Sequence, residues 1–423
     1  MRNKSGPAAR YRAVTTRDLP ALAAAGRLTA EQVLAVRAVS TVLPFRTNEY
    51  VVDTLVDWSA APNDPIFRMT FPQAGMLPAA DLARLVDLLR RDAPAAEMTR
   101  VAGGIRERLN PHPDGQRELN MPLPGIQHKY ASTVLVFPSQ GQTCHAYCTY
   151  CFRWPQFVGE PDLRMATNDV DGFVAYLRAH PEVTDVLVTG GDALMMGTAT
   201  LARWVDAAMG VETVRTIRLG TKALSFWPHR FVTDPDADEL MRLFERVVGS
   251  GRHLAVMAHF SHPREVAPPV VAAAIRRIRA TGAVIRCQAP LIRGVNDDAS
   301  TWADLWTTTT QLGVVPYYMF VERDTGPRDW FAVPLARGHE IFRDAYSRVS
   351  GLARTVRGPV MSATPGKVVV DGVATVAGQE VFVLRYLQAR DPALVGRPFF
   401  AEYDPAALWF TDLKPALGAG TFL

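Results

Sequence analysis

The pattern of hydrophobic and polar positions changes character near residue 130. Before that point, apolar residues recur at helical spacing over 19–42 and 79–89, which predicts a helical N-terminal segment. A stretch rich in proline, asparagine and glycine over 110–124 indicates a linker or a set of loops at the end of this segment. From residue 134 onward, short β-branched runs appear, so a second type of architecture is expected there.

Short apolar runs alternate with amphipathic stretches between residues 134 and 320. The predicted strands are Val134–Phe137, Asp185–Thr189, Val214–Leu219, His253–Ala258, Val284–Gln288 and Val315–Phe320. The predicted helices are Val170–Ala179, Thr200–Ala208, Pro235–Val248, Val270–Ala280 and Ser300–Leu312. Such alternation is typical of parallel βα units. Because these units are too few to close an eight-stranded barrel, we expect an α/β fold with a partial (β/α)6 TIM-like barrel.

The alternation ends near residue 350. Two further apolar runs, 368–376 and 380–387, flank Gly378 and predict a β-hairpin in a small C-terminal cap. The predicted organisation is therefore an N-terminal helical segment with its linker over 1–125, a barrel over 126–350 and a cap over 351–423. The N-terminal segment is large enough to offer an assembly surface, so a homo-oligomer is compatible with this organisation.

Composition excludes several classes of protein. Hydrophobic residues make up 48% of the 423 positions and charged residues 21%, which is typical of a soluble globular protein. The chain has no apolar run of membrane-spanning length, and its start lacks a signal-peptide core, so we expect a cytoplasmic protein without a membrane association. The net charge is only +4, and no basic stripe is interleaved with aromatics, so no nucleic-acid partner is expected.

Three of the four cysteines lie in one short run. Cys144, Cys148 and Cys151 have the spacing C-x3-C-x2-C, directly after the first predicted strand. Cysteine thiolates hold iron–sulfur clusters, and three of them leave one iron of a [4Fe–4S] cluster open to another ligand. A structural zinc site needs four ligands, and no second cysteine pair exists here. Disulfides are not expected, because the run has an odd number of thiols and Cys287 stands alone.

Other polar motifs follow the ends of later predicted strands. The segment Gly190-Gly191-Asp192 follows the second strand, where glycine permits a close approach of the backbone to a ligand. His259 ends the fourth strand and Gln288 ends the fifth. Each has an ordinary structural reading as well, as a strand-to-helix turn or as a polar group satisfied at the edge of the core. Their common position at strand ends favours a ligand site.

Taken in order, these motifs resemble the radical SAM superfamily and, within it, the lysine 2,3-aminomutase family. The resemblance extends from about residue 62 to 318 and is specific at 144–151, 185–194, 259–263, 291–297 and 316–318. It implies a [4Fe–4S] cluster on the three cysteines, S-adenosylmethionine (SAM) on the open iron, and an electron donor such as flavodoxin or ferredoxin. It further implies SAM contacts from Gly190, Gly191, Asp192, His259 and Gln288. Arg153 matches the family's arginine for the substrate carboxylate, a role that suits a guanidinium.

Two features depart from the family pattern. Family members bind pyridoxal phosphate through a lysine that follows a run of glycines, and here the candidate Lys367 follows the single Gly366. Lys367 is therefore either the pyridoxal phosphate lysine or a surface lysine that leads into a strand. Lysine-acting members also place an aspartate a few residues after a pair of tyrosines, which is Tyr317-Tyr318 in this chain. In one register Arg323 takes that place here, which favours an acidic or neutral substrate side chain. A shift of one residue puts Glu322 or Asp324 there instead.

Three functions are compatible with these observations. The first is an isomerase of the 2,3-aminomutase type, which moves the amino group of an amino-acid-like substrate and gives a β-amino acid. The second is a relative without pyridoxal phosphate that catalyses a dehydrogenation, an epimerisation or an elimination on such a small molecule. The third is an iron–sulfur module without catalysis, against which the SAM-type motifs at Gly190 and His259 argue.

Overall fold

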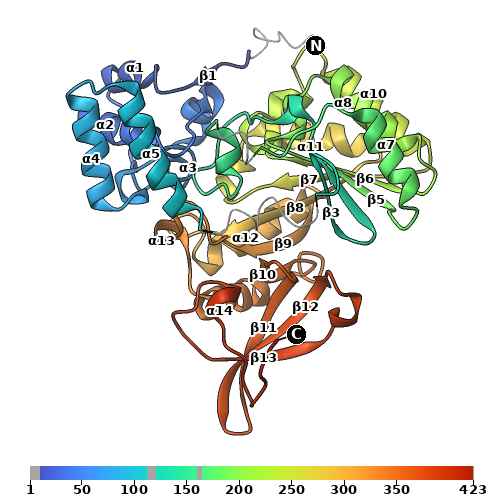
Figure 1. Cartoon of the computed structure of the whole chain (residues 1–423). Helices are drawn as coiled ribbons and strands as arrows, with labels where there is room; N and C mark the ends of the chain where they lie inside the picture. The colour runs from blue at the N-terminus through green and yellow to red at the C-terminus, as the bar shows by residue number, and fades with distance from the viewer. Residues whose placement is uncertain (1–9, 112–120, 160–163, 423) are drawn as a thin grey trace.

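The computed structural model describes residues 10–111, 121–159 and 164–422. Figure 1 shows the helical N-terminal segment beside a central layer of strands and helices, with the C-terminal strands β11 to β13 (residues 366–402) below that layer. Of the predicted linker, residues 112–120 lie outside the described residues.

The N-terminal segment is helical as predicted. Its elements are β1 (Ala13–Val14), α1 (Leu19–Ala24), α2 (Ala30–Val39), β2 (Thr47–Asn48), α3 (Pro65–Thr70), α4 (Ala79–Arg90) and α5 (Ala95–Leu109), with a π-helical turn at Val51–Leu55. The predicted helical stretch 19–42 is divided in two. Gly26 has φ +70°, and Thr29 then begins α2 with a capping box, in which its side chain accepts from the Gln32 N–H. Helix α5 was not predicted.

The central segment contains every strand and helix predicted for it. The strands are β3 (Ile126–Tyr130), β4 (Thr133–Val136), β5 (Asp185–Val188), β6 (Thr216–Thr221), β7 (His253–His259), β8 (Val284–Leu291) and β9 (Val315–Val321). The helices are α7 (Val170–Ala179), α8 (Thr198–Met209), α9 (Ala223–Phe226), α10 (Ala237–Gly249), α11 (Pro269–Ala280), α12 (Ala299–Gln311), α13 (Arg328–Phe331) and α14 (Leu335–Ser347). Strands β4 to β9 are parallel neighbours in chain order, and β3 is antiparallel to β4.

The C-terminal segment corrects the prediction of six parallel strands. Strand β10 (Arg357–Ser362) pairs parallel to β9 and is a seventh strand of the series, because α14 completes another βα unit. The hairpin predicted around Gly378 is confirmed as β11 (Gly366–Val376) and β12 (Gln379–Ala389), followed by β13 (Pro398–Glu402). These strands do not form a separate sheet: the described residues contain one eleven-stranded sheet from β13 to β3.

The sheet curls strongly. Lys129, on the edge strand β3, donates a hydrogen bond from Nζ to the Ala363 carbonyl oxygen at 2.7 Å. Ala363 directly follows β10, which lies seven strands away from β3 in the order of the sheet. A flat sheet would hold these two strands far apart, so the strands between them must bend around a shared interior.

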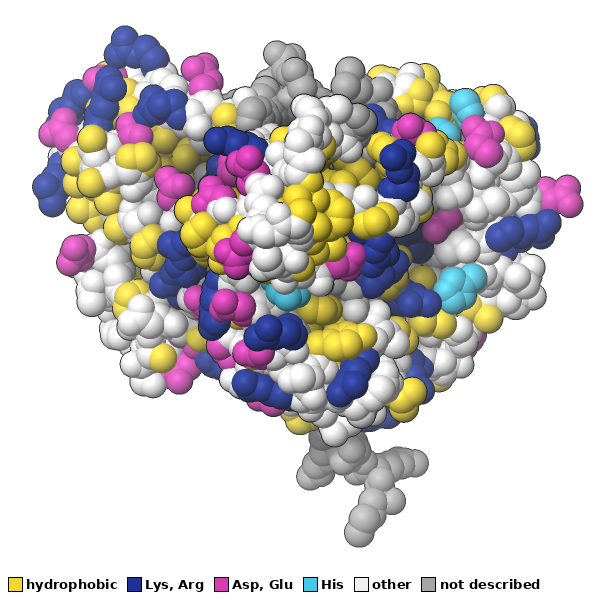
Figure 2. Space-filling model, turned by 90° about the horizontal axis from the view of Figure 1, so that it is seen from below, with side chains coloured by type: hydrophobic (Ala, Val, Ile, Leu, Met, Phe, Trp, Pro, Cys, Tyr) yellow, Lys and Arg dark blue, Asp and Glu magenta, His cyan; other side chains and the backbone are white. Residues whose placement is uncertain are grey.

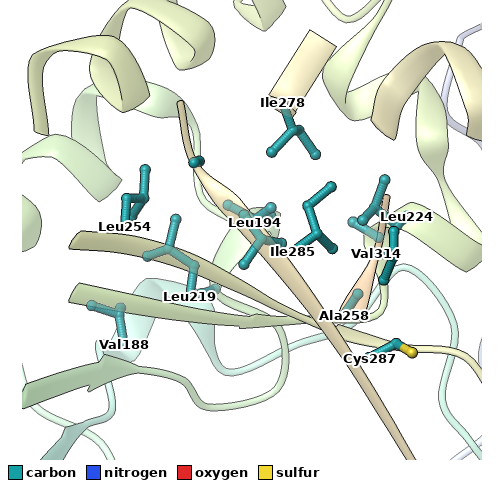
Figure 3. Close-up of a cluster of buried hydrophobic side chains, with 14 of the residues drawn as sticks. Val188, Leu194, Leu219, Leu224, Leu254, Ala258, Ile278, Ile285, Cys287 and Val314 are labelled. Atoms are coloured by element: carbon teal, nitrogen blue, oxygen red, sulfur yellow. The ribbon is translucent and has the colours of Figure 1, made fainter. Parts of the chain in front are cut away.

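Alternation along the strands separates this interior from the hydrophobic core. On β8, Ile285, Cys287, Ala289 and Leu291 are buried in the core, and the residues between them are only half-buried. Figure 3 shows Ile285 and Cys287 among side chains from neighbouring strands and helices. Burial raises the pKa of Cys287 to about 12, and its Sγ lies 3.8 Å from Thr309 Oγ1. The lone cysteine is therefore a core residue, and the polar residues Arg286 and Gln288 face the interior.

On the outside of the molecule, basic and acidic side chains are interspersed over the face that Figure 2 shows. None of the described helices is both long and apolar enough to cross a membrane.

Candidate active site

The cysteine run forms a loop after β4 that the N-terminal segment holds in place. The backbone N–H of Tyr147 donates to Arg46 O at 2.8 Å, and that of Thr149 donates to Met69 O at 2.9 Å. Asn48 Nδ2 donates to the His145 carbonyl oxygen at 3.1 Å. These partners lie about a hundred residues before the loop, and no local signal links them to it. The N-terminal segment thus supplies one wall of the site, which the sequence did not indicate.

The three cysteines of this loop are unpaired and half-buried. Burial raises the pKa of Cys148 to about 11 and that of Cys151 to about 12, and the pKa of Cys144 lies well above its usual range for the same reason. Bound metal displaces such protons, because thiolate is the ligand. Within the described ranges, no three metal-binding side chains close on a point for a single ion. A cluster places each thiolate on a separate iron, so three thiols on one loop fit a cluster better than an ion.

The two glycines after β5 allow the cysteine loop to approach closely. Gly190 has φ +148°, and a Cβ at Gly191 would collide with the backbone of Thr143. In place of side chains, the backbone N–H of Gly191 donates to Gly141 O at 3.0 Å, and that of Asp192 donates to Thr143 O at 2.8 Å. The glycines therefore join two loops at adjacent strand ends. A contact of Gly190 and Gly191 with SAM stays a prediction.

The carboxylate of Asp192 points into the protein. It is 2% exposed and accepts hydrogen bonds from Thr221 Oγ1 at 2.7 Å, Lys222 N at 2.8 Å and Leu194 N at 2.9 Å. Burial raises its pKa, and these donors oppose that shift. Asp192 thus ties the end of β5 to the end of β6. Its predicted contact with SAM remains untested, and its side chain already serves a structural purpose.

His259 and Gln288 lie side by side. They are register partners on the parallel strands β7 and β8, and Gln288 is also aligned with Tyr318 on β9. His259 Nε2 lies 3.1 Å from Ser261 Oγ and 3.3 Å from the Tyr150 hydroxyl. Burial lowers the pKa of His259 well below its usual range, and Lys222 adds to this shift, so the ring is neutral. The structure therefore brings both predicted SAM contacts close to the cysteine loop.

A buried ion pair at this end of the sheet was not foreseen from the sequence. Lys222 Nζ lies 2.6 Å from Glu265 Oε1, and Glu265 is completely buried. The same carboxylate accepts hydrogen bonds from Ser225 Oγ and from the backbone N–H of Ser261 and His262. Since Lys222 follows β6 and Glu265 follows β7, the pair fastens two strand ends below the cysteine loop. Neither residue belongs to a motif, so only the fold reveals the pair.

Arg153 lies beside the cysteines. Its guanidinium carbon is 4.6 Å from the ring centroid of Phe137 and 5.2 Å from that of Phe152. Burial lowers the pKa of Arg153 to about 10, a value at which it still carries its charge at neutral pH. Its buried Nη1 has no hydrogen-bond partner among the residues that the structure describes. A buried cationic donor of this kind suits an anionic ligand, as the predicted carboxylate-binding role requires.

The sequence did not decide whether Glu322 or Arg323 takes the place of the family's aspartate. The structure gives the two residues different surroundings. Glu322 continues the alternation of Tyr318 and Phe320, is 8% exposed, and influences the pKa of Cys148 and Cys151. It forms no hydrogen bond or ion pair with any described residue, and burial raises its pKa well above the usual range. Arg323 stacks 5.1 Å from Phe152 and 5.9 Å from Trp409 of the C-terminal segment. Glu322 therefore faces the interior, and Arg323 lies nearer its rim.

Lys367 occupies a second centre within the same interior. Its Nζ lies 4.7 Å from the ring centroid of Tyr130 and 5.8 Å from that of Tyr318, and it donates to Gln388 Oε1 at 2.6 Å. Burial lowers the pKa of Lys367 to about 7, and the charges of three cations add to this shift. They are Lys129 on β3, Arg218 on β6 and Arg357 on β10. Lys367 is thus half-buried, with its amine toward the interior, and its attachment to pyridoxal phosphate stays a prediction.

Comparison with known proteins places this geometry in context. No family model matches the chain. A protein of Aquifex aeolicus, provisionally named L-lysine 2,3-aminomutase, is 32% identical over 369 residues that cover 87% of each chain. The L-lysine 2,3-aminomutase of Clostridium subterminale is 26% identical over 69% of this chain and 60% of that protein. A radical SAM methyltransferase structure from Sphaerobacter thermophilus covers 55% of this chain and 68% of its own at 18% identity, and its TM-score of 0.38 is too low to support an argument.

Proposed function

The chain belongs to the lysine 2,3-aminomutase family of radical SAM enzymes, and from that premise we propose that it moves the amino group of an amino acid between adjacent carbons. The product would be a β-amino acid. The observation that carries this proposal is Lys367, whose amine lies beside Tyr130, Tyr318 and Gln388 on the same curled sheet whose strand β4 leads into the cysteine loop. The curl of the sheet supports a partial barrel that encloses both the cysteine loop and the surroundings of Lys367.

The cysteine loop and its surroundings fit a [4Fe–4S] cluster with SAM. Cys144, Cys148 and Cys151 would hold three irons and leave the fourth to the cofactor. When bound, the cluster and SAM supply the one-electron chemistry that removes a hydrogen atom from the substrate. The protein's own contribution is positional. His259 and Gln288 present polar groups from adjacent strands, and the N-terminal segment holds the cysteine loop through backbone hydrogen bonds.

The surroundings of Lys367 fit pyridoxal phosphate. A neutral amine is needed for covalent attachment, and burial together with nearby cations lowers the pKa of Lys367 to about 7, so that about half of the amine is neutral at pH 7. Those cations also favour a phosphate group close by. When bound, this cofactor supplies a conjugated ring that lets an amino group migrate. The rings of Tyr130 and Tyr318 both lie close to the amine and offer flat apolar surfaces there.

The substrate carboxylate would bind Arg153. Its unpaired buried Nη1 can donate to a carboxylate oxygen, and the charge of the guanidinium strengthens that bond. Arg153 lies two residues after Cys151, so a substrate bound there stands next to the cluster loop. The charge of Arg323 lowers the pKa of both Arg153 and Tyr130, so Arg323 lies near enough to influence both.

A second function has one specific observation in its favour. Lys367 Nζ already donates to Gln388 Oε1 at 2.6 Å, a bond that would serve a purely structural lysine. In that case the enzyme would act without pyridoxal phosphate and catalyse a dehydrogenation, an epimerisation or an elimination. The non-catalytic module is set aside, because the chain belongs to a family of enzymes.

One experiment separates these two functions. The protein is purified without oxygen, reconstituted with iron and sulfide, incubated with pyridoxal phosphate and reduced with borohydride. We expect a cluster absorbance and a pyridoxyl label on Lys367 in peptide maps. Lys367→Ala should lose the label, whereas Lys414→Ala, which removes an exposed lysine, should keep it. A cluster with no label on Lys367 would retire the aminomutase mechanism in favour of the second function.

A further inference from the structure

The cysteine run contains two tyrosines with different surroundings. Tyr147 stacks on Phe157 with ring centroids 4.8 Å apart, and its hydroxyl lies 3.2 Å from Thr143 Oγ1 within the same loop. Tyr150 is 5% exposed and points the other way, toward the end of β7. Its hydroxyl lies 2.8 Å from Ser261 Oγ and 3.3 Å from His259 Nε2. Tyr150 is thus the side chain of the run that reaches the predicted SAM-binding strand end.

Ser261 is a fixed anchor for this contact. It is completely buried, and its backbone N–H donates to the Glu265 carboxylate, which is itself paired with Lys222. Its carbonyl oxygen accepts from Asn296 Nδ2 at 2.9 Å. With both backbone groups bonded, the serine hydroxyl has little freedom to move away from Tyr150.

The ring of His259 is held by the same two hydroxyls. Both Tyr150 and Ser261 approach Nε2, while Nδ1 makes no hydrogen bond with the residues described here. A histidine whose one nitrogen is occupied by the protein has a defined orientation, and its other nitrogen is left for a ligand. Because the hydroxyls of Tyr150 and Ser261 orient the ring through Nε2, they also determine the direction in which Nδ1 points.

Tyr150 also belongs to the backbone of the cysteine loop, where it stands between Cys148 and Cys151. Its side chain therefore joins the loop of the candidate cluster ligands to the histidine expected to contact SAM.

We propose that Tyr150 is a positioning residue that fixes the cysteine loop and His259 relative to each other, so that the cluster and SAM are bound in register. This inference rests on the proposed function, because it presumes that the loop carries a cluster and that SAM binds beside it. Tyr150 would act through the backbone of the cysteine loop and through His259, and would not itself react.

The test compares two single-atom deletions in one loop. Tyr150→Phe and Tyr147→Phe each remove one hydroxyl and leave the ring in place. Iron content and visible absorbance are measured first, followed by the dissociation constant of SAM for the oxidised enzyme, which does not cleave it. We expect both variants to keep the cluster. Tyr150→Phe should weaken SAM binding about fivefold to tenfold, the effect of one buried hydrogen bond. Tyr147→Phe should change it by less than about twofold.

Ser261→Ala provides an independent variant outside the cysteine run. It removes the anchor of Tyr150 without changing a cluster ligand. If Tyr150→Phe fails to retain iron, SAM binding by Ser261→Ala tests the proposal instead. Weaker SAM binding in Ser261→Ala with a full cluster supports the proposal. Unchanged SAM binding in Ser261→Ala, or in Tyr150→Phe with an intact cluster, overturns it. If the unmodified protein holds no cluster or binds no SAM, the proposed function itself fails, and that result appears before any variant is compared.

Discussion

The two centres of the interior are built in opposite ways. The cysteine loop is a single continuous run, and its three thiols come from residues 144 to 151. The surroundings of Lys367 are gathered from β3, β6, β9 and β10, which are distant in the sequence. The first centre can be recognised in the sequence, because spacing alone brings its three thiols onto one loop. The second exists only because the sheet curls until Lys129 reaches Ala363.

This difference predicts how each centre responds to change. A local centre should fail when one of its own residues is removed, or when the loop that it occupies is displaced. A centre assembled from many strands should be tuned by the combined charge around it. The following predictions test that contrast, from the largest expected effect to the smallest.

Loss of one cluster ligand should have the largest effect. Cys148→Ala removes a thiolate that no other described side chain can replace, so iron-linked absorbance and all SAM cleavage should disappear. Cys287→Ala is the matched control, because that thiol is buried in the core away from the loop. Cluster content is measured by iron analysis and absorbance. SAM cleavage that persists in Cys148→Ala would refute the assignment of the cluster to this run.

Removal of the Arg153 guanidinium should abolish turnover but not the cluster. Arg153→Gln takes away the charged donor expected for the substrate carboxylate, and we expect substrate turnover to fall about a hundredfold or more. Slow SAM cleavage without substrate should persist, since the thiols are unchanged. The control Arg246→Gln alters an exposed arginine on α10 that pairs with Asp206. Unaltered turnover in Arg153→Gln would show that the carboxylate binds elsewhere.

Displacement of the cysteine loop should reduce stability and iron together. Gly191→Ala places a Cβ against the Thr143 backbone, and forced repacking of this kind costs about 1–3 kcal/mol in unfolding free energy. Gly249→Ala, at the end of α10, meets open space and should be neutral or slightly stabilising. Urea unfolding and iron content are compared in the two variants. Equal stability and equal iron would mean that the two loops do not need this close approach.

The Lys367 centre should respond to pH. Burial and neighbouring cations lower the pKa of this amine to about 7, so it loses its proton as the pH rises through that value. The rate of pyridoxal phosphate attachment should therefore increase about tenfold between pH 6 and pH 8 and then level off. An exposed lysine such as Lys414 should continue to gain reactivity above pH 8. Attachment at Lys367 that is still rising steeply at pH 9 would contradict a buried amine.

The strands and helices of the central segment could be predicted because each depends on a local period. The run 134–137 and the other apolar runs were all found as strands within a few residues. Strand β10 escaped prediction because Gly358 and Pro359 interrupt its apolar run, as in a turn. It is a strand nonetheless, because β9 on one side and β11 on the other supply its hydrogen bonds.

The candidate site likewise contains residues that a local pattern predicts and residues that only the fold brings together. The cysteines, the glycine pair and His259 could be named from the sequence, because a strand end followed by a short polar motif is a local pattern. Three other features could not be predicted from the sequence. They are the ion pair of Lys222 with Glu265, the hydrogen bond from Asn48 to the cysteine loop and the cations around Lys367. Local sequence specifies backbone conformation over a few residues through dihedral preference and hydrophobic period. Contacts between segments far apart in the chain, and the burial that shifts a lysine to a pKa of about 7, arise only when the whole sheet has folded and curled.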